Sequence, residues 1–200
     1  MAHTGTAFPV IWLESGLHNT PKKLNTRLRE ELKKTDAERV LLAMGFCGNS
    51  LAGLKADGFE IIVPKADDCI SLLLGSVERR MEISQELAAY FLTEGWMQGE
   101  WNLWAEYQHS VQEFGEETAQ MIAQMMYGHY RTLGILHIDE QPLEPLVESS
   151  KIIAVTLHLN QQIIHGTLSW LEELLTGPWN NGKYLVIPDQ KEITMMDMVL

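Results

Sequence analysis

The chain has 200 residues, of which 46% are hydrophobic and 21% are charged, a balance typical of a folded domain and unlike a disordered segment. Its formal net charge of -12 at pH 7 disfavours nucleic acids and anionic membranes as partners, because both require a basic protein surface. No run approaches the roughly 20 apolar residues of a membrane span, and the first residues lack the pattern of a secretory signal. We therefore expect one cytoplasmic domain over residues 1–200.

The first part of the chain alternates expected strands and helices. Apolar runs predict buried strands at residues 8–13, 39–45 and 59–64. Leucine spacing and capping residues predict helices at residues 20–32, 51–54 and 70–74. This order favours an α/β class with a mostly parallel open sheet, Rossmann-like and three-layered, with helices on both faces.

The pattern continues less sharply beyond residue 88. Further strands are predicted at residues 89–93, 132–138 and 184–188. Helical spacing of aromatic and methionine residues predicts helices at residues 101–111 and 121–126, separated by Gly115. Two more helices are predicted, one from residue 141 and one at 167–175. Residues 152–159 are apolar and β-branched, so their state is left open.

The predicted chemistry gathers in three loops that follow the first three strands. In an open parallel sheet, ligands bind outside the carboxyl ends of the strands, where the loops converge. The loops carry His18 and Asn19, then Cys47 and Asn49, then Lys65, Asp67, Asp68 and Cys69. Both cysteines of the protein are therefore expected at one edge of the sheet.

Thiolate, imidazole and carboxylate groups together form a plausible ligand set for Zn²⁺ or Fe²⁺. The predicted metal ligands are His18, Cys47, Asp67 and Cys69, with Asn19, Asn49, Lys65 and Asp68 around them as ligand-binding or orienting residues. Two alternatives stay open. A cysteine could be a reactive thiol activated by a helix N-terminus, or the carboxylates could simply cap a helix over packed cysteines.

Several common motifs are missing from the sequence. Gly45, Gly48 and Gly53 do not form the GxGxxG fingerprint, and neither a Walker motif nor a GxSxG elbow occurs. The histidines at 109, 129 and 137 are interpreted as core or surface residues, and those at 158 and 165 receive no role. The helices rich in Trp and Met are interpreted mainly as packing, although such helices can also form an adaptable partner surface.

The motifs at the three loops resemble the uncharacterised domain-of-unknown-function family number 1638. The resemblance rests on the segments Gly16–Pro21, Met44–Asn49, Ile62–Pro64, Asp68–Ile70, Leu73–Ser76, Tyr90–Trp96 and Leu174–Trp179. Family members are known from methanogenic archaea and anaerobic bacteria, often near genes of corrinoid-dependent methyltransferases. Two departures are expected to alter the site: Asp67 stands where the family is expected to carry His, and a further strand with an early cysteine is missing.

These observations lead to three functional hypotheses. The first is a metal or thiol site that serves corrinoid-linked methyl or one-carbon metabolism. The second is a non-catalytic module that binds a small anionic or cofactor-like ligand at the N-termini of two short helices. The third is an accessory subunit that docks through the Trp- and Met-rich helices. The expected partner of the protein is a small-molecule ligand or a corrinoid methyltransferase system. Catalysis and the oligomeric state are left open.

Overall fold

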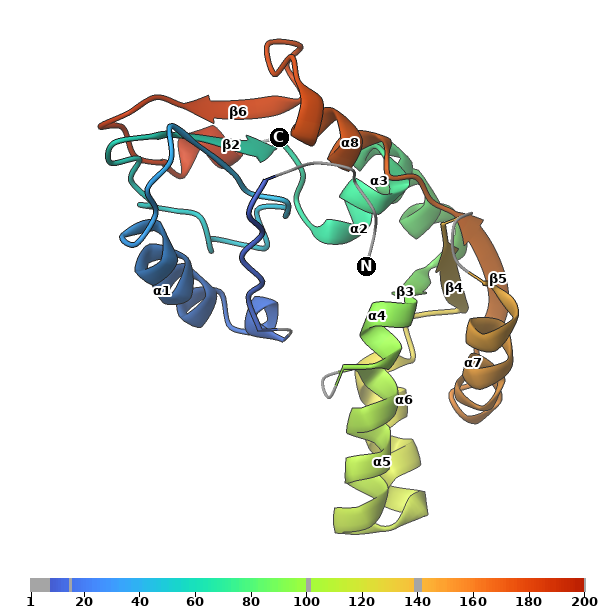
Figure 1. Cartoon of the computed structure of the whole chain (residues 1–200). Helices are drawn as coiled ribbons and strands as arrows, with labels where there is room; N and C mark the ends of the chain where they lie inside the picture. The colour runs from blue at the N-terminus through green and yellow to red at the C-terminus, as the bar shows by residue number, and fades with distance from the viewer. Residues whose placement is uncertain (1–7, 15, 100–101, 139–141, 200) are drawn as a thin grey trace. The chain divides into compact units, whose positions relative to one another are not determined.

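The structure is a computed structural model that describes residues 8–14, 16–99, 102–138 and 142–199 (Figure 1). The chain packs as two compact units, one made of Met1–Val77 with Thr167–Leu200 and the other of Glu78–Gly166. Both units mix helices and strands, which confirms the α/β class, whereas the single domain over residues 1–200 stays a prediction. Within the described ranges, no helix is both long and apolar enough to cross a membrane.

The first unit holds a mixed sheet, which has three strands in the described part of the chain. Strands β1 (Arg39–Leu41) and β2 (Glu60–Pro64) are parallel, with Val40 opposite Ile61. Strand β6 (Tyr184–Ile187) pairs antiparallel with the other side of β2. The helices of this unit are α1 (Pro21–Leu32), α2 (Cys69–Leu74) and α8 (Ser169–Thr176), with the 3-10 turns η1 (Leu17–Asn19) and η2 (Met196–Met198).

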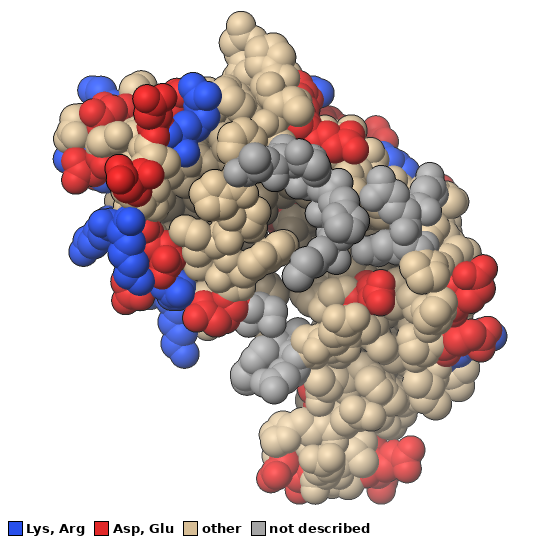
Figure 2. Space-filling view, in the orientation of Figure 1, with Lys and Arg blue, Asp and Glu red and all other residues tan. Residues whose placement is uncertain are grey.

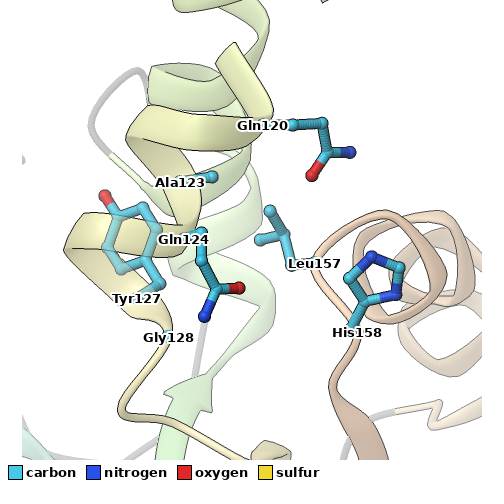
Figure 3. A pocket seen from close by; sticks show the side chains of 7 residues that line it. All are labelled: Gln120, Ala123, Gln124, Tyr127, Gly128, Leu157 and His158. Carbon is cyan, nitrogen blue, oxygen red and sulfur yellow. The ribbon is translucent and has the colours of Figure 1, made fainter. Parts of the chain in front are cut away.

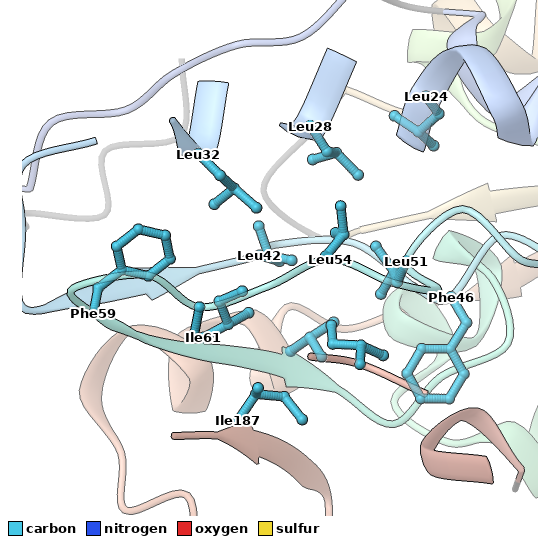
Figure 4. Packing of buried hydrophobic residues seen from close by; sticks show 13 residues of the cluster. Leu24, Leu28, Leu32, Leu42, Phe46, Leu51, Leu54, Phe59, Ile61 and Ile187 are labelled. Carbon is cyan, nitrogen blue, oxygen red and sulfur yellow. The ribbon is translucent and has the colours of Figure 1, made fainter. Parts of the chain in front are cut away.

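The alternation of side chains along β2 explains how this sheet is covered. Ile61 and Val63 belong to a cluster with the three buried leucines of α1, at positions 24, 28 and 32 (Figure 4). Ile62 points to the opposite face and packs with Trp170 and Leu174 of α8 and with Leu72 of α2. Because successive side chains of a strand alternate between faces, β2 can be buried on both sides.

The second unit contains a parallel sheet in the order β3-β4-β5. The strands are β3 (Ala89–Leu92), β4 (Thr132–His137) and β5 (Asn160–His165). Its helices are α3 (Val77–Leu87), which begins on the last residue of the first unit, α4 (Glu94–Met97), α5 (Leu103–Phe114), α6 (Glu116–Tyr127) and α7 (Glu144–Thr156). Gly115 separates α5 from α6 as predicted, and Trp101 and Gln141, where helices were expected to begin, lie outside the described residues.

Two layers cover the parallel sheet of the second unit. Leu133 and Ile135 of β4 pack with Leu146 and Ile153 of α7. On the other face, the guanidinium of Arg80 from α3 lies 6.0 Å from the ring centre of Phe91. A small pocket of about 10 Å³ lies between α6 and the end of α7 (Figure 3). That volume has room for about one water molecule, so this pocket does not serve a metabolite.

The predicted strand at residues 8–13 is wrong, because these residues form irregular backbone. Most of its apolar side chains lie in solvent: Ile11 is 59% and Trp12 is 84% exposed, whereas Leu13 packs against the core. A strand needs a neighbour that accepts its backbone hydrogen bonds, and Pro9 additionally has no N–H to donate. An apolar run alone therefore did not establish a strand here.

The predicted short helix at residues 51–54 is also wrong, since this segment forms turns. Its backbone groups bond to the C-terminal segment instead. Gly53 N–H donates to the Ile193 carbonyl over 2.7 Å, and Ile193 N–H donates to the Leu54 carbonyl over 2.8 Å. Gly53 also has a φ of +71°, a left-handed conformation that interrupts a helix.

The single, mostly parallel open sheet is corrected to two small sheets, one mixed and one parallel. The parallel strand pair that follows α1 exists as predicted. The next strand, β3, does not join that pair but begins the second sheet, and β6 returns to the first sheet in the antiparallel direction. The hydrophobic pattern predicted the positions of β1 to β4 and of β6, whereas strand pairing depends on contacts between distant segments.

Candidate functional site

The predicted loops two and three run side by side past the carboxyl ends of β1 and β2. Leu42 N–H donates to the Ile62 carbonyl over 2.8 Å and so prolongs the strand pairing by one residue. Farther on, Phe46 N–H donates to the Ala66 carbonyl over 2.7 Å, and Cys47 N–H donates to the Asp67 carbonyl over 2.8 Å. These bonds bring Cys47 next to the segment that leads into α2.

The backbone of Gly45 packs directly against the backbone of Asp68, next to the two cysteines. A Cβ atom on Gly45 would lie 2.6 Å from the carbonyl carbon of Asp68 and 2.7 Å from its Cα. Cβ atoms essentially never come that close to other atoms, so only glycine fits at position 45 without a shift of the backbone. The sequence shows Gly45 only as part of an incomplete GxGxxG pattern, which gives no hint of this contact.

The carboxylates of Asp67 and Asp68 are fixed at the start of α2. Asp68 is the N-cap residue, and its Oδ1 accepts a hydrogen bond from Ser71 N–H over 2.9 Å. The hydroxyl of Ser71, which is fully buried, donates to Oδ1 of Asp67. The helix-capping alternative is therefore confirmed for Asp68. Ser71 orients Asp67. Ser71 follows Asp67 by four residues, and this helical spacing is the sequence signal that could have predicted the contact.

The two cysteines meet at the first residue of α2. The thiol of Cys47 is half-buried against the core of the first unit, and Cys69 is exposed at the residue level. Desolvation raises the pKa of Cys47 to about 11, helped by the negative charges of Asp68 and Asp67 and opposed by the backbone amides of Gly45 and Cys69. Desolvation also raises the pKa of Cys69 to about 12, followed by the charges of Cys47 and Asp68.

Both thiols are therefore protonated at neutral pH. A nucleophilic cysteine requires a lowered pKa, so the reactive-thiol alternative finds no support in this environment. A bound metal ion would lower the pKa of both thiols, because its positive charge stabilises the thiolates that the neighbouring carboxylates destabilise.

The first predicted loop approaches the second through the start of α1. A Cβ atom on Gly48 would lie 3.5 Å from Cγ of Pro21, so the turn after Cys47 lies beside the first residue of α1. Asn25 of α1 donates from Nδ2 to the carbonyls of Ser50 and Ala52, over 2.7 Å and 2.9 Å. Asn25 thereby fixes the turn that follows Cys47 against α1. The sequence does not predict this role, because Asn25 lies among the charged residues of the helix.

The remaining predicted residues lie on these loops with different surroundings. His18 lies on η1 and is half-buried, and Asn19 and Asn49 are exposed. Lys65 N–H donates to the Lys183 carbonyl over 2.8 Å. The pKa of Asp197 is lowered mainly by its hydrogen bonds from Thr194, with a smaller contribution from the charge of Lys65. Lys65 thus faces the C-terminal segment.

Among the described residues, no three side chains of His, Cys, Asp or Glu form a group that could hold a metal ion. His18, Cys47, Asp67 and Cys69 as a complete ligand set therefore stay a prediction. The structure does bring the two cysteines close enough to Asp67 and Asp68 for their charges to interact, without arranging them as a ligand set.

Charge around the first unit is mixed. Arg27 of α1 lies within ion-pair distance of Glu14, Glu30 and Glu31, and Lys34 pairs with Glu31 over 2.8 Å. Figure 2 accordingly shows Lys and Arg interspersed with Asp and Glu over the region of α1. The basic residues of this helix do not form an unmixed basic surface.

The fold and this site define an α/β protein with two thiols and two carboxylates at the carboxyl edge of a parallel strand pair. The chain belongs to the family described as protein of unknown function (DUF1638), whose model matches residues 12–175. No curated protein and no solved structure matches the chain.

Proposed function

We propose that this protein binds a transition-metal ion, Zn²⁺ or Fe²⁺, through the thiolates of Cys47 and Cys69. Asp67 supplies a carboxylate oxygen, and His18 completes the ligand set when the ion binds. The observation that carries this proposal is that both cysteines lie at the start of α2, where Cys47 N–H donates a hydrogen bond to the Asp67 carbonyl. Two sulfur ligands with nitrogen and oxygen donors suit either metal.

The charges at this site favour a cation over an anion. Asp67 and Asp68 flank the thiols and raise the pKa of Cys47, so they would repel an anionic ligand from the same place. Helix α2 has only six residues, so its dipole offers little attraction for an anion. The charge of Lys65 lowers the pKa of Asp197 and does not contribute at the thiols. The small-anion hypothesis is accordingly the weaker one.

We place this metal site in cytoplasmic methyl or one-carbon metabolism linked to corrinoids, the setting that the family resemblance implies. With the two thiolates and Asp67 as its protein ligands, a tetrahedral ion keeps a fourth coordination position, which either His18 or a small substrate can take. Ser71 supports such a site by holding one oxygen of Asp67 and leaving the second oxygen for the ion.

Protein purified without chelators should contain about one Zn or Fe atom per chain, measured by elemental analysis. Because both thiols carry protons before binding, the ion displaces two protons and its apparent affinity falls as the pH falls. Between pH 6 and 8 the affinity should rise by about 100-fold per pH unit. Cys69→Ser should reduce this to about tenfold, since one displaced proton is lost.

Calorimetry in buffers of different ionisation enthalpy counts the released protons. Asp67→Asn should weaken binding, whereas Asp57→Asn, an exposed carboxylate elsewhere in the first unit, serves as the matched control. A protein that holds no stoichiometric transition metal and regains none on titration would contradict the proposal.

A second candidate function is that of an accessory subunit, and one observation favours it. Met121, Met125 and Met126 of α6 are 56%, 79% and 51% exposed, and Phe114 at the end of α5 is also exposed. Exposed methionines form adaptable apolar partner surfaces. If this helix docks onto a corrinoid methyltransferase, Met125→Lys should abolish co-elution of the two purified proteins, and Glu117→Lys should not. Equal elution of both variants would contradict docking through this face.

A further inference from the structure

Two histidines face each other at the carboxyl edge of the second sheet. His137 is the last residue of β4 and His165 is the last residue of β5, and the strand register pairs them directly. Their ring centres lie 6.0 Å apart at an angle of 67°. This edge is where loops converge and ligands bind in parallel sheets. The sequence gives no sign of the pair, because the two residues are 28 positions apart and the state of the segment before residue 160 is ambiguous.

Hydrogen bonds fix the backbone of both residues. Gly166 N–H donates to the His137 carbonyl over 2.7 Å. Nη2 of Arg79 donates to the His165 carbonyl over 2.8 Å. The two imidazoles therefore project from strand ends that are held in place, and little rearrangement is needed to bring a ligand between them.

We propose that His137 and His165 form a two-imidazole site for a divalent transition-metal ion, separate from the cysteine site. An ion about 2.0–2.1 Å from one nitrogen of each ring would separate the ring centres by roughly 5–6 Å, close to the observed distance. His165 is exposed and His137 is half-buried, so water completes the coordination. Cu²⁺ and Ni²⁺ bind imidazole most strongly among these divalent ions, so we expect them to bind this pair more tightly than Zn²⁺ does.

The test uses Cu²⁺ alone as the probe, in a protein that carries His3→Ala, Cys47→Ser and Cys69→Ser. This background removes the thiols, so the result does not depend on the function proposed for them, and it removes His3 as a competing imidazole. The protein should bind one equivalent of Cu²⁺, and its electron paramagnetic resonance spectrum should show two nitrogen ligands. His137→Asn and His165→Asn should each weaken binding by at least about tenfold and leave one nitrogen.

His158→Asn is the matched control, since His158 lies two residues before β5 begins and has a φ of +56°, a conformation that Asn adopts readily. It should leave affinity and spectrum unchanged. Circular dichroism checks that each variant folds, and His165→Asn, at an exposed side chain, is the safer of the two. If the serine variant does not fold, Cys47→Ala and Cys69→Ala replace the serine substitutions in the same comparison. Unchanged affinity in both histidine variants would overturn the proposal.

Discussion

Gly45→Ala should lower the free energy of unfolding by about 1–3 kcal/mol and weaken metal binding at Cys47 and Cys69 at the same time. The added methyl carbon would lie 2.6–2.7 Å from backbone atoms of Asp68, and backbone cannot swing aside as a flexible side chain can. The two loops must therefore separate, which pulls Cys47 away from Cys69. Urea unfolding and metal titration measure the two effects.

Gly95→Ala is the control for this substitution. A Cβ atom on Gly95 would meet only Thr93 Oγ1 at 4.0 Å, and neither glycine has a positive φ. Its free energy of unfolding should stay within about 0.5 kcal/mol of the parent value. If Gly45→Ala were as stable as Gly95→Ala and bound metal as tightly as the parent, the loops would not meet as described.

Ile61→Ala should lower the free energy of unfolding by about 2–5 kcal/mol, because it removes buried methyl groups and leaves a cavity between β2 and α1. Ile61 is 0% exposed and contacts the leucine cluster of Figure 4. Ile11→Ala makes the same chemical change at a residue that is 59% exposed, and its effect should stay within about 0.5 kcal/mol.

This pair of variants separates two accounts of the N-terminal segment. The sequence pattern predicts Ile11 in a buried strand, and then both substitutions would cost similar amounts. The structure places Ile11 in irregular, exposed backbone. A loss of more than about 2 kcal/mol in Ile11→Ala would contradict the structure and restore the predicted strand.

Local patterns were sufficient where the neighbours of an element are close in the sequence. The leucines at 24, 28 and 32 predicted α1, and the pair Asp67-Asp68 predicted a carboxylate cap for α2, which Asp68 provides. Strand β5 shows the opposite case. Its sequence starts with Asn160, Gln161 and Gln162, which does not resemble a buried strand, and it forms because β4 provides a parallel partner.

The same distinction between local patterns and distant contacts applies to the candidate site. The loops after two neighbouring parallel strands lie close together, and they bring Cys47 near Cys69, as the carboxyl-edge rule predicts; a ligand at this place stays a prediction. The supports of the site were missed. Gly45, Asn25 and Ser71 act through one close contact and a few hydrogen bonds, and such contacts depend on coordinates that no spacing in the sequence encodes.

The most direct test of the central claim is X-ray absorption spectroscopy of the protein loaded with one equivalent of Zn²⁺. The His137→Asn/His165→Asn variant is the protein to use, so that the histidine pair does not compete for the ion. We predict two sulfur neighbours at about 2.3 Å from zinc, and one in each of the Cys47→Ser and Cys69→Ser derivatives. A zinc ion without sulfur neighbours, or one that keeps two of them in either derivative, would contradict a shared site for Cys47 and Cys69.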